Sequence, residues 1–397
     1  MINNFNRQDE FGFYQVGEYT SYSKVEALEV SKKTGKEVIW NFNNEILKNY
    51  NWKIEPPESF KELYGRRAKQ IREKYDYIVL WYSGGADSNN MVNSFIKNNL
   101  HIDEIAQYHN YEADGTWDSY FNEEVAKVAA PNTQQLIKDY PNIKHRLFDQ
   151  SKLTATVYNK DNNHLDFIYK QNNWLTPNAI TRSYFRENCK DWQDIIDSGK
   201  TLCFVWGIEK PILQLINGKY CVRYADVFDN CVSPRRQQLN REWEHDEFFY
   251  WSPEMPDLVA KQGHTIMKHL RSINQSNIEL LVKSNWLTTD ILLATPNNTT
   301  PMPNLVFNNK QYYLPNNSMH TMIYPWWDPT TFSNGKTPSV FFSARDVWWL
   351  KDHTQKNQNV FIGGIKYLTE KFPTSVTGRR LFQSNPVKMF SPPYWLE

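Results

Sequence analysis

The sequence YIVLWYSGGADSNNMV, which runs from Tyr77 to Val92, joins an apolar run to a serine–glycine turn and a polar segment. The apolar part does not alternate with polar residues, which is typical of a strand that is buried on both faces of a parallel sheet. Two glycines then allow a tight turn, and a helix is predicted to begin at about Ser88. We therefore expect residues 83–88, hereafter the SGGADS turn, to lie at the carboxyl end of a buried strand.

The SGGADS turn has the chemistry of a phosphate-binding loop. The first backbone amides of a helix have no partner within the helix, and the helix dipole places partial positive charge beside them. The hydroxyl groups of Ser83 and Ser88 add hydrogen-bond donors. The Asp87 carboxylate can bind a magnesium ion that is also coordinated by the phosphates. The alternative is a turn that binds no ligand, in which Asp87 and Ser88 serve only as N-caps.

The pattern S-G-G-x-D-S directly after a hydrophobic strand resembles the pyrophosphate-loop signature of the N-type ATP pyrophosphatases, also called adenine nucleotide alpha hydrolases. This superfamily includes asparagine synthetases, 7-cyano-7-deazaguanine synthase, tRNA thiolation enzymes and phosphoadenylylsulfate reductases. The resemblance covers residues 76–213, and the loop is its one specific motif. The matching residues are Ser83, Gly84, Gly85, Asp87 and Ser88.

The resemblance implies a doubly wound α/β fold with about five parallel strands, which we expect within residues 70–215. It also implies that ATP is cleaved between its α and β phosphates, so that pyrophosphate leaves and a substrate is adenylated. ATP and Mg2+ are then the expected ligands, and Asp87 is both the metal ligand and a catalytic residue. The residues expected to bind the phosphates are Ser83, Gly84, Gly85, Ala86, Asp87 and Ser88.

Two further strand ends carry candidate residues. In the family, the end of the second strand flanks adenine and ribose, and here that end carries Tyr108 and His109. A hydrogen-bonded structural role is the alternative for the histidine. The fourth predicted strand ends at Gly207, and Lys210 follows it. In a doubly wound sheet this turn lies beside the SGGADS turn, and several members of the family carry a glycine here that contacts pyrophosphate, so Gly207 is a further candidate to bind the nucleotide. A lysine there would balance the charge of the leaving pyrophosphate, whereas an ordinary solvated turn lysine is the alternative.

Other charged residues have two interpretations each. Arg182 and Arg186 are four residues apart and share one face of a predicted helix. Arginine suits phosphate oxygens, so Arg182 is a candidate catalytic residue, and a surface pair facing acidic partners is the alternative. Lys261 and His264 lie on a predicted amphipathic helix, where they either reach the active cleft or belong to a solvated face.

The chain divides into four parts by pattern. Residues 1–60 form an α+β preface, and residues 61–215 alternate strands and helices as an ATP pyrophosphatase core would. Residues 216–284 extend the core with a hairpin that turns on Asn217 and Gly218 and with an amphipathic helix. Residues 285–397 are rich in Asn, Pro and Trp, and their pattern predicts no particular role.

The composition excludes several classes of protein. Lys and Arg number 45 against 44 Asp and Glu, so net charge does not indicate a nucleic-acid partner. No apolar run approaches the roughly 20 residues that span a bilayer, and no signal peptide is visible, so a cytoplasmic location is expected. The abundance of Asn, Lys and aromatic residues is typical of an AT-rich genome such as that of a phage, for which the location would be the host cytoplasm.

The four cysteines form no C-x-x-C pair, so buried free thiols are expected rather than a metal or redox site. Sulfur chemistry usually needs cysteine in the site, and Ile2 stands where asparagine synthetases carry the cysteine that hydrolyses glutamine. We therefore expect a ligase that adenylates a carboxyl or carbonyl substrate for attack by an amine or ammonia. The acceptor and the oligomeric state remain open. The alternatives are a phosphoadenylylsulfate reductase-like or sulfur-transfer enzyme, and a nucleotide-binding protein without catalysis.

Overall fold

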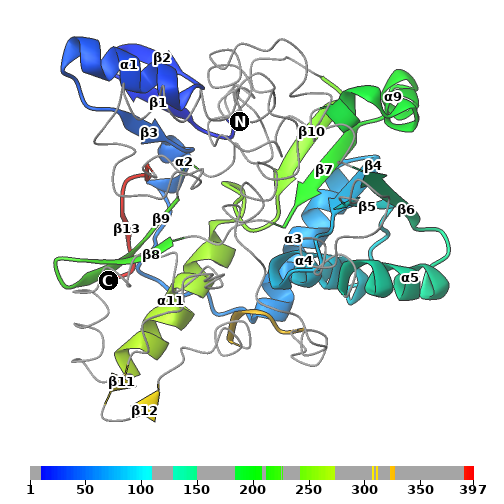
Figure 1. Cartoon of the computed structure of the whole chain (residues 1–397). Coiled ribbons are helices and arrows are strands. Elements are labelled where there is room, and N and C mark those ends of the chain that lie inside the picture. Colours follow the sequence, from blue (N-terminus) through cyan, green and yellow to red (C-terminus); the bar gives the residue numbers. More distant parts are fainter. Residues whose placement is uncertain are drawn as a thin grey trace.

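A computed structural model of the chain shows an α/β fold built around a five-stranded, all-parallel sheet (Figure 1). The described residues also form smaller antiparallel sheets, one of them in the N-terminal part of the chain. The structure describes residues 10–109, 128–149, 184–207, 212–224, 226, 242–272, 306–307, 310–311, 322–326 and 389–397.

The parallel sheet has the order β10-β7-β4-β5-β6, and every neighbouring pair is parallel. Its central strand β4 lies between β5, which follows it in sequence, and β7, which comes much later. The chain therefore reverses its direction of travel across the sheet at β4. In open parallel sheets, ligands bind outside the carboxyl ends of the strands at such a reversal. The strands are β4 (Tyr77–Trp81), β5 (Glu104–His109), β6 (Lys144–Asp149), β7 (Leu202–Trp206) and β10 (Glu244–Phe248).

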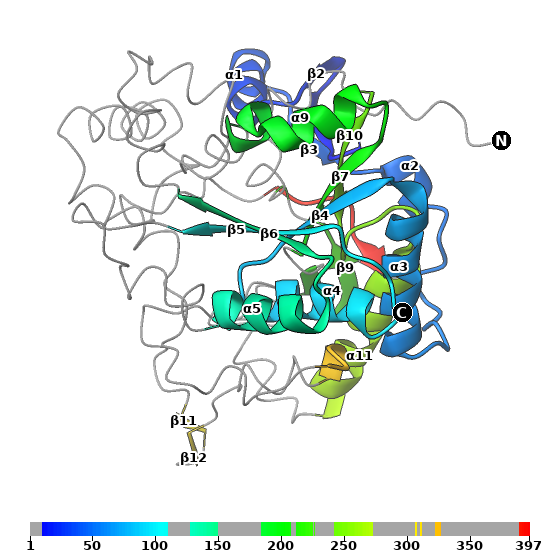
Figure 2. The same ribbon diagram turned by 90° about the vertical axis from the view of Figure 1, so that its right-hand side faces the viewer.

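Helices lie on both sides of this sheet. Figure 2 shows α9 (Lys190–Asp197) on one side of it, with α4 (Ala86–Ile96) and α5 (Ala130–Asp139) on the other. The helix α3 (Phe60–Lys74), which precedes β4, begins at a capping box formed by Ser59 and Glu62. Within the described residues the predicted alternation of strands and helices is confirmed; residues 122–127 and 176–183 of the predicted helical stretches lie outside them.

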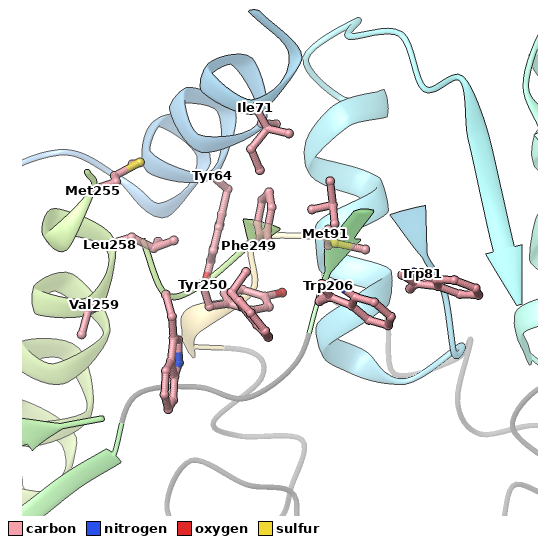
Figure 3. Close-up of a cluster of buried hydrophobic side chains, with 14 of the residues drawn as sticks. Tyr64, Ile71, Trp81, Met91, Trp206, Phe249, Tyr250, Met255, Leu258 and Val259 are labelled. Atoms are coloured by element: carbon pink, nitrogen blue, oxygen red, sulfur yellow. The ribbon is translucent and has the colours of Figure 1, made fainter. Parts of the chain in front are cut away.

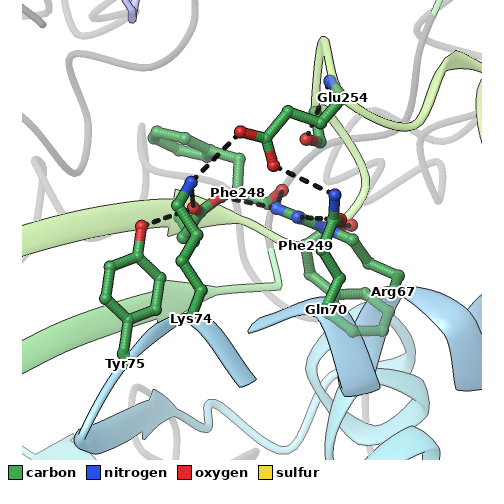
Figure 4. Close-up of polar contacts among 9 residues, drawn as sticks. Arg67, Gln70, Lys74, Tyr75, Phe248, Phe249 and Glu254 are labelled. Atoms are coloured by element: carbon green, nitrogen blue, oxygen red, sulfur yellow. Dashed lines mark hydrogen bonds and ion pairs between the residues drawn. The ribbon is translucent and has the colours of Figure 1, made fainter. Parts of the chain in front are cut away.

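The fifth parallel strand lies outside the predicted range of 70–215. It is β10, whose sequence EHDEF carries three acidic residues, all of them buried. The carboxylate of Glu247 accepts hydrogen bonds from Arg67 at 2.6 Å, from Lys74 at 2.9 Å and from the hydroxyl of Tyr75 at 2.6 Å; Figure 4 labels these three donors. Although burial opposes it, the charges of Arg67 and Lys74 lower the pKa of Glu247 to about 2. Basic residues on α3 thus compensate the charge that the strand brings into the interior.

The other face of β10 is held by Arg186. Its guanidinium donates to both carboxylate oxygens of Asp246, at 2.7 and 2.9 Å, and to Glu244 at 2.8 Å. The indole of Trp206 also donates to Asp246, at 2.7 Å. Arg186 is 3% exposed, so this is a buried ion cluster and not a surface pair. The phosphate-binding interpretation of Arg186 is therefore wrong.

The N-terminal unit is a three-stranded antiparallel sheet of order β2-β1-β3 with two helices. The predicted helix is confirmed, because Ser23 caps α1 and Gly35 ends it with a φ of 70°. A buried ion pair of 2.5 Å joins Lys24 of this helix to Asp226, which follows the hairpin in sequence. The elements are β1 (Phe13–Val16), β2 (Tyr19–Ser21), α1 (Lys24–Thr34), β3 (Ile39–Asn41) and α2 (Asn44–Leu47).

The predicted hairpin is also confirmed. Its two strands turn at Asn217 and Gly218, both of which have positive φ, as the favoured two-residue hairpin turn requires. A late segment of the chain, β13, adds a third antiparallel strand to it. The remaining elements are β8 (Ile212–Ile216), β9 (Lys219–Arg223), α11 (Pro256–Ser272), β11 (Val306–Phe307), β12 (Lys310–Gln311) and β13 (Tyr394–Trp395).

The core is rich in aromatic side chains. Figure 3 shows Tyr64, Phe249 and Tyr250 packed together, with Met91 of α4 and Leu258 of α11 around them. This cluster packs α3, α4, α11 and the segment after β10 against one another. None of the helices in the described part of the chain is long and apolar enough to cross a membrane.

Candidate functional site

The SGGADS turn lies directly beyond the carboxyl end of β4, as predicted. Gly84 is buried and has a φ of 85°, a conformation that favours glycine. The helix α4 begins at Ala86 with Gly85 as its N-cap, two residues earlier than expected. Asp87 and Ser88 therefore lie within the first turn of the helix, so the prediction that they serve as N-caps is wrong.

The polar groups of the turn suit an anionic ligand. Gly85 has no side chain, so no capping hydrogen bond from that position engages the amides of the first helical turn. The hydroxyl oxygens of Ser83 and Ser88 are 3.1 Å apart, and Ser83 is exposed. The turn thus combines helix-start amides, two hydroxyl groups and no large side chain. This set of donors fits the oxygens of a phosphate group.

Gly207, at the end of β7, lies against the start of α4. A Cβ atom added to Gly207 would be 2.9 Å from the Cα of Ser88 and 3.3 Å from the backbone oxygen of Asp87. Both are backbone atoms of α4, so a side chain at residue 207 could be accommodated only if the start of the helix moved. The structure therefore brings together the SGGADS turn and the residue after the fourth strand, as predicted from the sequence. Lys210 and Arg182 lie outside the described residues.

Tyr108 lies beside the same edge of the sheet. Its ring stacks on Trp81 of β4, with centroids 4.3 Å apart and planes inclined by 10°. Trp81 in turn stacks on Trp206 of β7 at 5.2 Å, and Phe148 of β6 lies 6.0 Å from Tyr108. These four side chains form an aromatic row across the carboxyl ends of four strands. His109 is the last residue of β5, and its backbone pairs with Asp149 of β6.

Two tyrosines that the sequence analysis did not single out contact Asp87. The hydroxyl of Tyr250 donates to the backbone oxygen of Asp87 at 2.6 Å, and the hydroxyl of Tyr324 donates to Oδ1 of its carboxylate. Burial, followed by the negative charge of Asp87, raises the pKa of Tyr324 well above its usual value, so the hydroxyl stays protonated and donates. Neither tyrosine belongs to a motif, and both are brought to the site by the tertiary fold.

Lys261 and His264 do not reach this site. Lys261 donates to the backbone oxygen of Pro56 at 2.9 Å and pairs with Glu55 at 3.0 Å. His264 is buried, and its Nε2 lies 2.9 Å from the backbone oxygen of Trp52. Both residues attach α11 to the segment before α3, so the expectation that they line an active cleft is wrong, as is the alternative of a solvated face.

Sequence comparisons identify no relative: no protein-family model matches the chain, and no curated protein is significantly similar to it. Any functional conclusion therefore depends on the SGGADS turn and on its position in the sheet.

Proposed function

We propose that this protein is a magnesium-dependent ATP pyrophosphatase with the doubly wound fold of the adenine nucleotide alpha hydrolases. The observation that carries the proposal is the SGGADS turn at the carboxyl end of β4, where the strand order reverses. That position is the expected ligand site of an open parallel sheet, and a phosphate is the ligand that the turn fits best.

In this proposal the turn binds the β and γ phosphates as one leaving group. The amides of Gly84 and Gly85 and the hydroxyls of Ser83 and Ser88 would donate to the pyrophosphate oxygens, and Asp87 would hold the magnesium ion. In the structure the Gly85 amide donates to Oγ of Ser83 at 3.3 Å and the Ser88 hydroxyl donates to the backbone oxygen of Gly85 at 3.1 Å, so a bound phosphate would replace these two contacts within the turn. A magnesium ion held by Asp87 would supply positive charge beside the pyrophosphate as it leaves. Nothing in the turn resembles the lysine that contacts the β and γ phosphates in the other common phosphate loop, G-x-x-x-x-G-K-[ST].

The α-phosphate then faces the second substrate. A carboxyl or carbonyl oxygen of that substrate attacks the α-phosphorus, and the bond from this phosphorus to the oxygen that bridges to the β-phosphorus breaks. Pyrophosphate leaves with the electron pair, and an amine or ammonia subsequently displaces AMP from the adenylated substrate. Tyr108 and His109 are proposed to flank the adenine and ribose, and Lys210 and Arg182 to balance the charge of the pyrophosphate.

The described cysteines disfavour sulfur transfer. Cys189, Cys203 and Cys221 are free and buried. Burial raises the pKa of Cys203 well above its usual value and that of Cys221 to about 11. A thiol must be ionised and accessible to act as a nucleophile, so these three residues suit the core rather than a reaction.

Incubation with α-labelled ATP, magnesium and a cell extract tests the reaction. We expect the label to accumulate as AMP, with release of pyrophosphate, and we expect this to depend on a second substrate in the extract. The control is the same extract without the protein. Label that accumulates as ADP would mean that a different bond breaks. Tight ATP binding without cleavage in any extract would favour the non-catalytic alternative.

The contact of Gly207 with α4 gives a second test. In a Gly207→Ala variant the new methyl group must displace the backbone of Ser88 and Asp87, which moves the amides that bind phosphate. We expect the affinity for ATP, measured by calorimetry, to fall by about tenfold.

Gly199→Ala is the matched control for this variant. Gly199 has a φ of 78°, and a Cβ atom there would meet nothing within 4 Å. This change should destabilise the protein by about 1 kcal/mol through backbone strain while leaving the affinity for ATP unchanged. Equal affinities for ATP in the two variants would show that the close contact at Gly207 does not matter for binding.

A further inference from the structure

Tyr324 reaches the proposed site from a remote part of the chain. It lies 237 residues beyond Asp87 in sequence, yet its hydroxyl donates to Oδ1 of the Asp87 carboxylate. The tyrosine side chain is almost completely buried, with an exposure of 2%. Its ring packs against Tyr250 and Tyr64, with centroid separations of 5.8 and 6.2 Å. The hydroxyl is therefore fixed in place by its surroundings.

A second tyrosine holds the backbone at the same residue. The hydroxyl of Tyr250 donates to the backbone oxygen of Asp87 at 2.6 Å and accepts a hydrogen bond of 3.1 Å from the side chain of Asn90. Asp87 is thus held twice, once through its backbone and once through its carboxylate. Both contacts come from outside the strand–turn–helix unit that contains Asp87.

Holding one carboxylate oxygen fixes the other. The two oxygens rotate together about a single torsion, so a hydrogen bond to Oδ1 also determines where Oδ2 points. Carboxylates that bind metal ions are commonly hydrogen-bonded in this way, and loss of such a partner typically weakens metal binding by about 10–100-fold.

We propose that Tyr324 is a positioning residue for the magnesium ion of the ATP site. Its hydroxyl orients the Asp87 carboxylate, so that the segment 322–326 contributes to a site whose phosphate-binding turn lies at residues 83–88. This inference rests on the proposed function, because it requires that Asp87 hold magnesium. It assigns a role in the site to the C-terminal part of the chain, for which the sequence pattern predicts none.

Tyr64 supplies a matched comparison. It belongs to the same buried cluster, and its ring contacts both Tyr250 and Tyr324. Its hydroxyl, however, accepts a hydrogen bond of 2.8 Å from Gln262 and so joins α3 to α11. Tyr64→Phe and Tyr324→Phe therefore each remove one buried hydroxyl group from one aromatic cluster, but only Tyr324→Phe removes a hydrogen bond to the Asp87 carboxylate.

The test is calorimetric titration of ATP into each protein at a series of magnesium concentrations. We expect Tyr324→Phe to need about 10–100-fold more magnesium than the wild-type protein for half-maximal ATP binding. Tyr64→Phe should match the wild-type protein. Both variants should show similar, small decreases in melting temperature. In an Asp87→Asn background, Tyr324→Phe should not raise the magnesium requirement further, because no carboxylate remains at residue 87 for Tyr324 to orient toward the ion.

The wild-type titration separates this inference from the proposed function. Wild-type protein that binds ATP without any dependence on magnesium, or not at all, overturns both. Wild-type protein that binds magnesium and ATP, together with an unchanged magnesium requirement in Tyr324→Phe, overturns this inference alone. Equal losses in Tyr324→Phe and Tyr64→Phe, or a Tyr324→Phe variant that does not fold, would assign Tyr324 to core packing and also overturn it.

Discussion

An Asp87→Asn variant is expected to cleave ATP about 100-fold more slowly than the wild-type protein, or more slowly still, without losing its fold. The substitution removes the negative charge that would hold magnesium. It keeps an oxygen that can accept the hydrogen bond from Tyr324, whose buried hydroxyl would otherwise lose its acceptor. Asparagine is therefore a cleaner replacement than alanine. The rate of AMP formation from labelled ATP measures the effect, and thermal unfolding verifies the fold.

Asp139→Asn is the matched control for the loss of a carboxylate. Asp139 ends α5, is exposed, and accepts a hydrogen bond of 3.2 Å from Gln135. We expect this variant to cleave ATP at the wild-type rate. An Asp87→Asn protein that did the same would exclude a magnesium-binding role for Asp87 and remove the main support for an ATP pyrophosphatase.

Replacing Arg186 by methionine is expected to lower the free energy of unfolding by about 3–5 kcal/mol. The change leaves the carboxylates of Glu244 and Asp246 buried without the guanidinium that compensates them. Methionine fills similar space, so the loss reflects charge rather than a cavity. The change can be measured by urea unfolding, with tryptophan fluorescence as the signal. Trp206 reports on this region because its indole donates a hydrogen bond to Asp246.

Lys190→Met is the control for this second prediction. Lys190 also pairs with an aspartate, Asp194, at 2.6 Å, but its side chain is 82% exposed. Exposed ion pairs contribute little, so its removal should leave the unfolding free energy nearly unchanged. If Arg186→Met and Lys190→Met were equally stable, the buried cluster on β10 would not hold the sheet together as the structure indicates.

The core of the fold could be predicted because its inner strands are apolar. The run at Tyr77–Trp81 and the run at Leu202–Trp206 are buried, and each is five residues long and rich in β-branched and aromatic residues, which favours a strand over a helix without tertiary information. The SGGADS turn could be placed for the same reason, since a recognisable strand precedes it. The hairpin was predictable from Asn217 and Gly218, which determine the turn locally.

The strand β10 could not be predicted from hydrophobic pattern. Its sequence EHDEF is mostly polar and resembles a solvated turn. The arginines and the lysine that compensate its charges are distant in sequence, since they come from α3 and from the segment before α9. The only signal is the aromatic run of residues 248–251 that follows it, and that run does not determine the sheet. Tyr250 and Tyr324 were missed for a related reason, because their contacts with Asp87 are purely tertiary.

The order of strands also keeps the most apolar strands of this nearly neutral protein away from the described edges of the sheet. With a net charge of +1, electrostatic repulsion between copies is weak. The apolar segment Tyr77–Trp81, which has the composition of an amyloid-forming strand, is paired on both sides within the sheet. Among the described strands the outermost are β10 and β6. The strand β6 carries the charged residues Lys144, Arg146 and Asp149, and β10 carries acidic residues that are buried and compensated by basic residues of the same chain, so a strand added from another copy would have to pair beside charged residues at either edge. Resistance to strand-by-strand association is therefore built into the edges of the sheet.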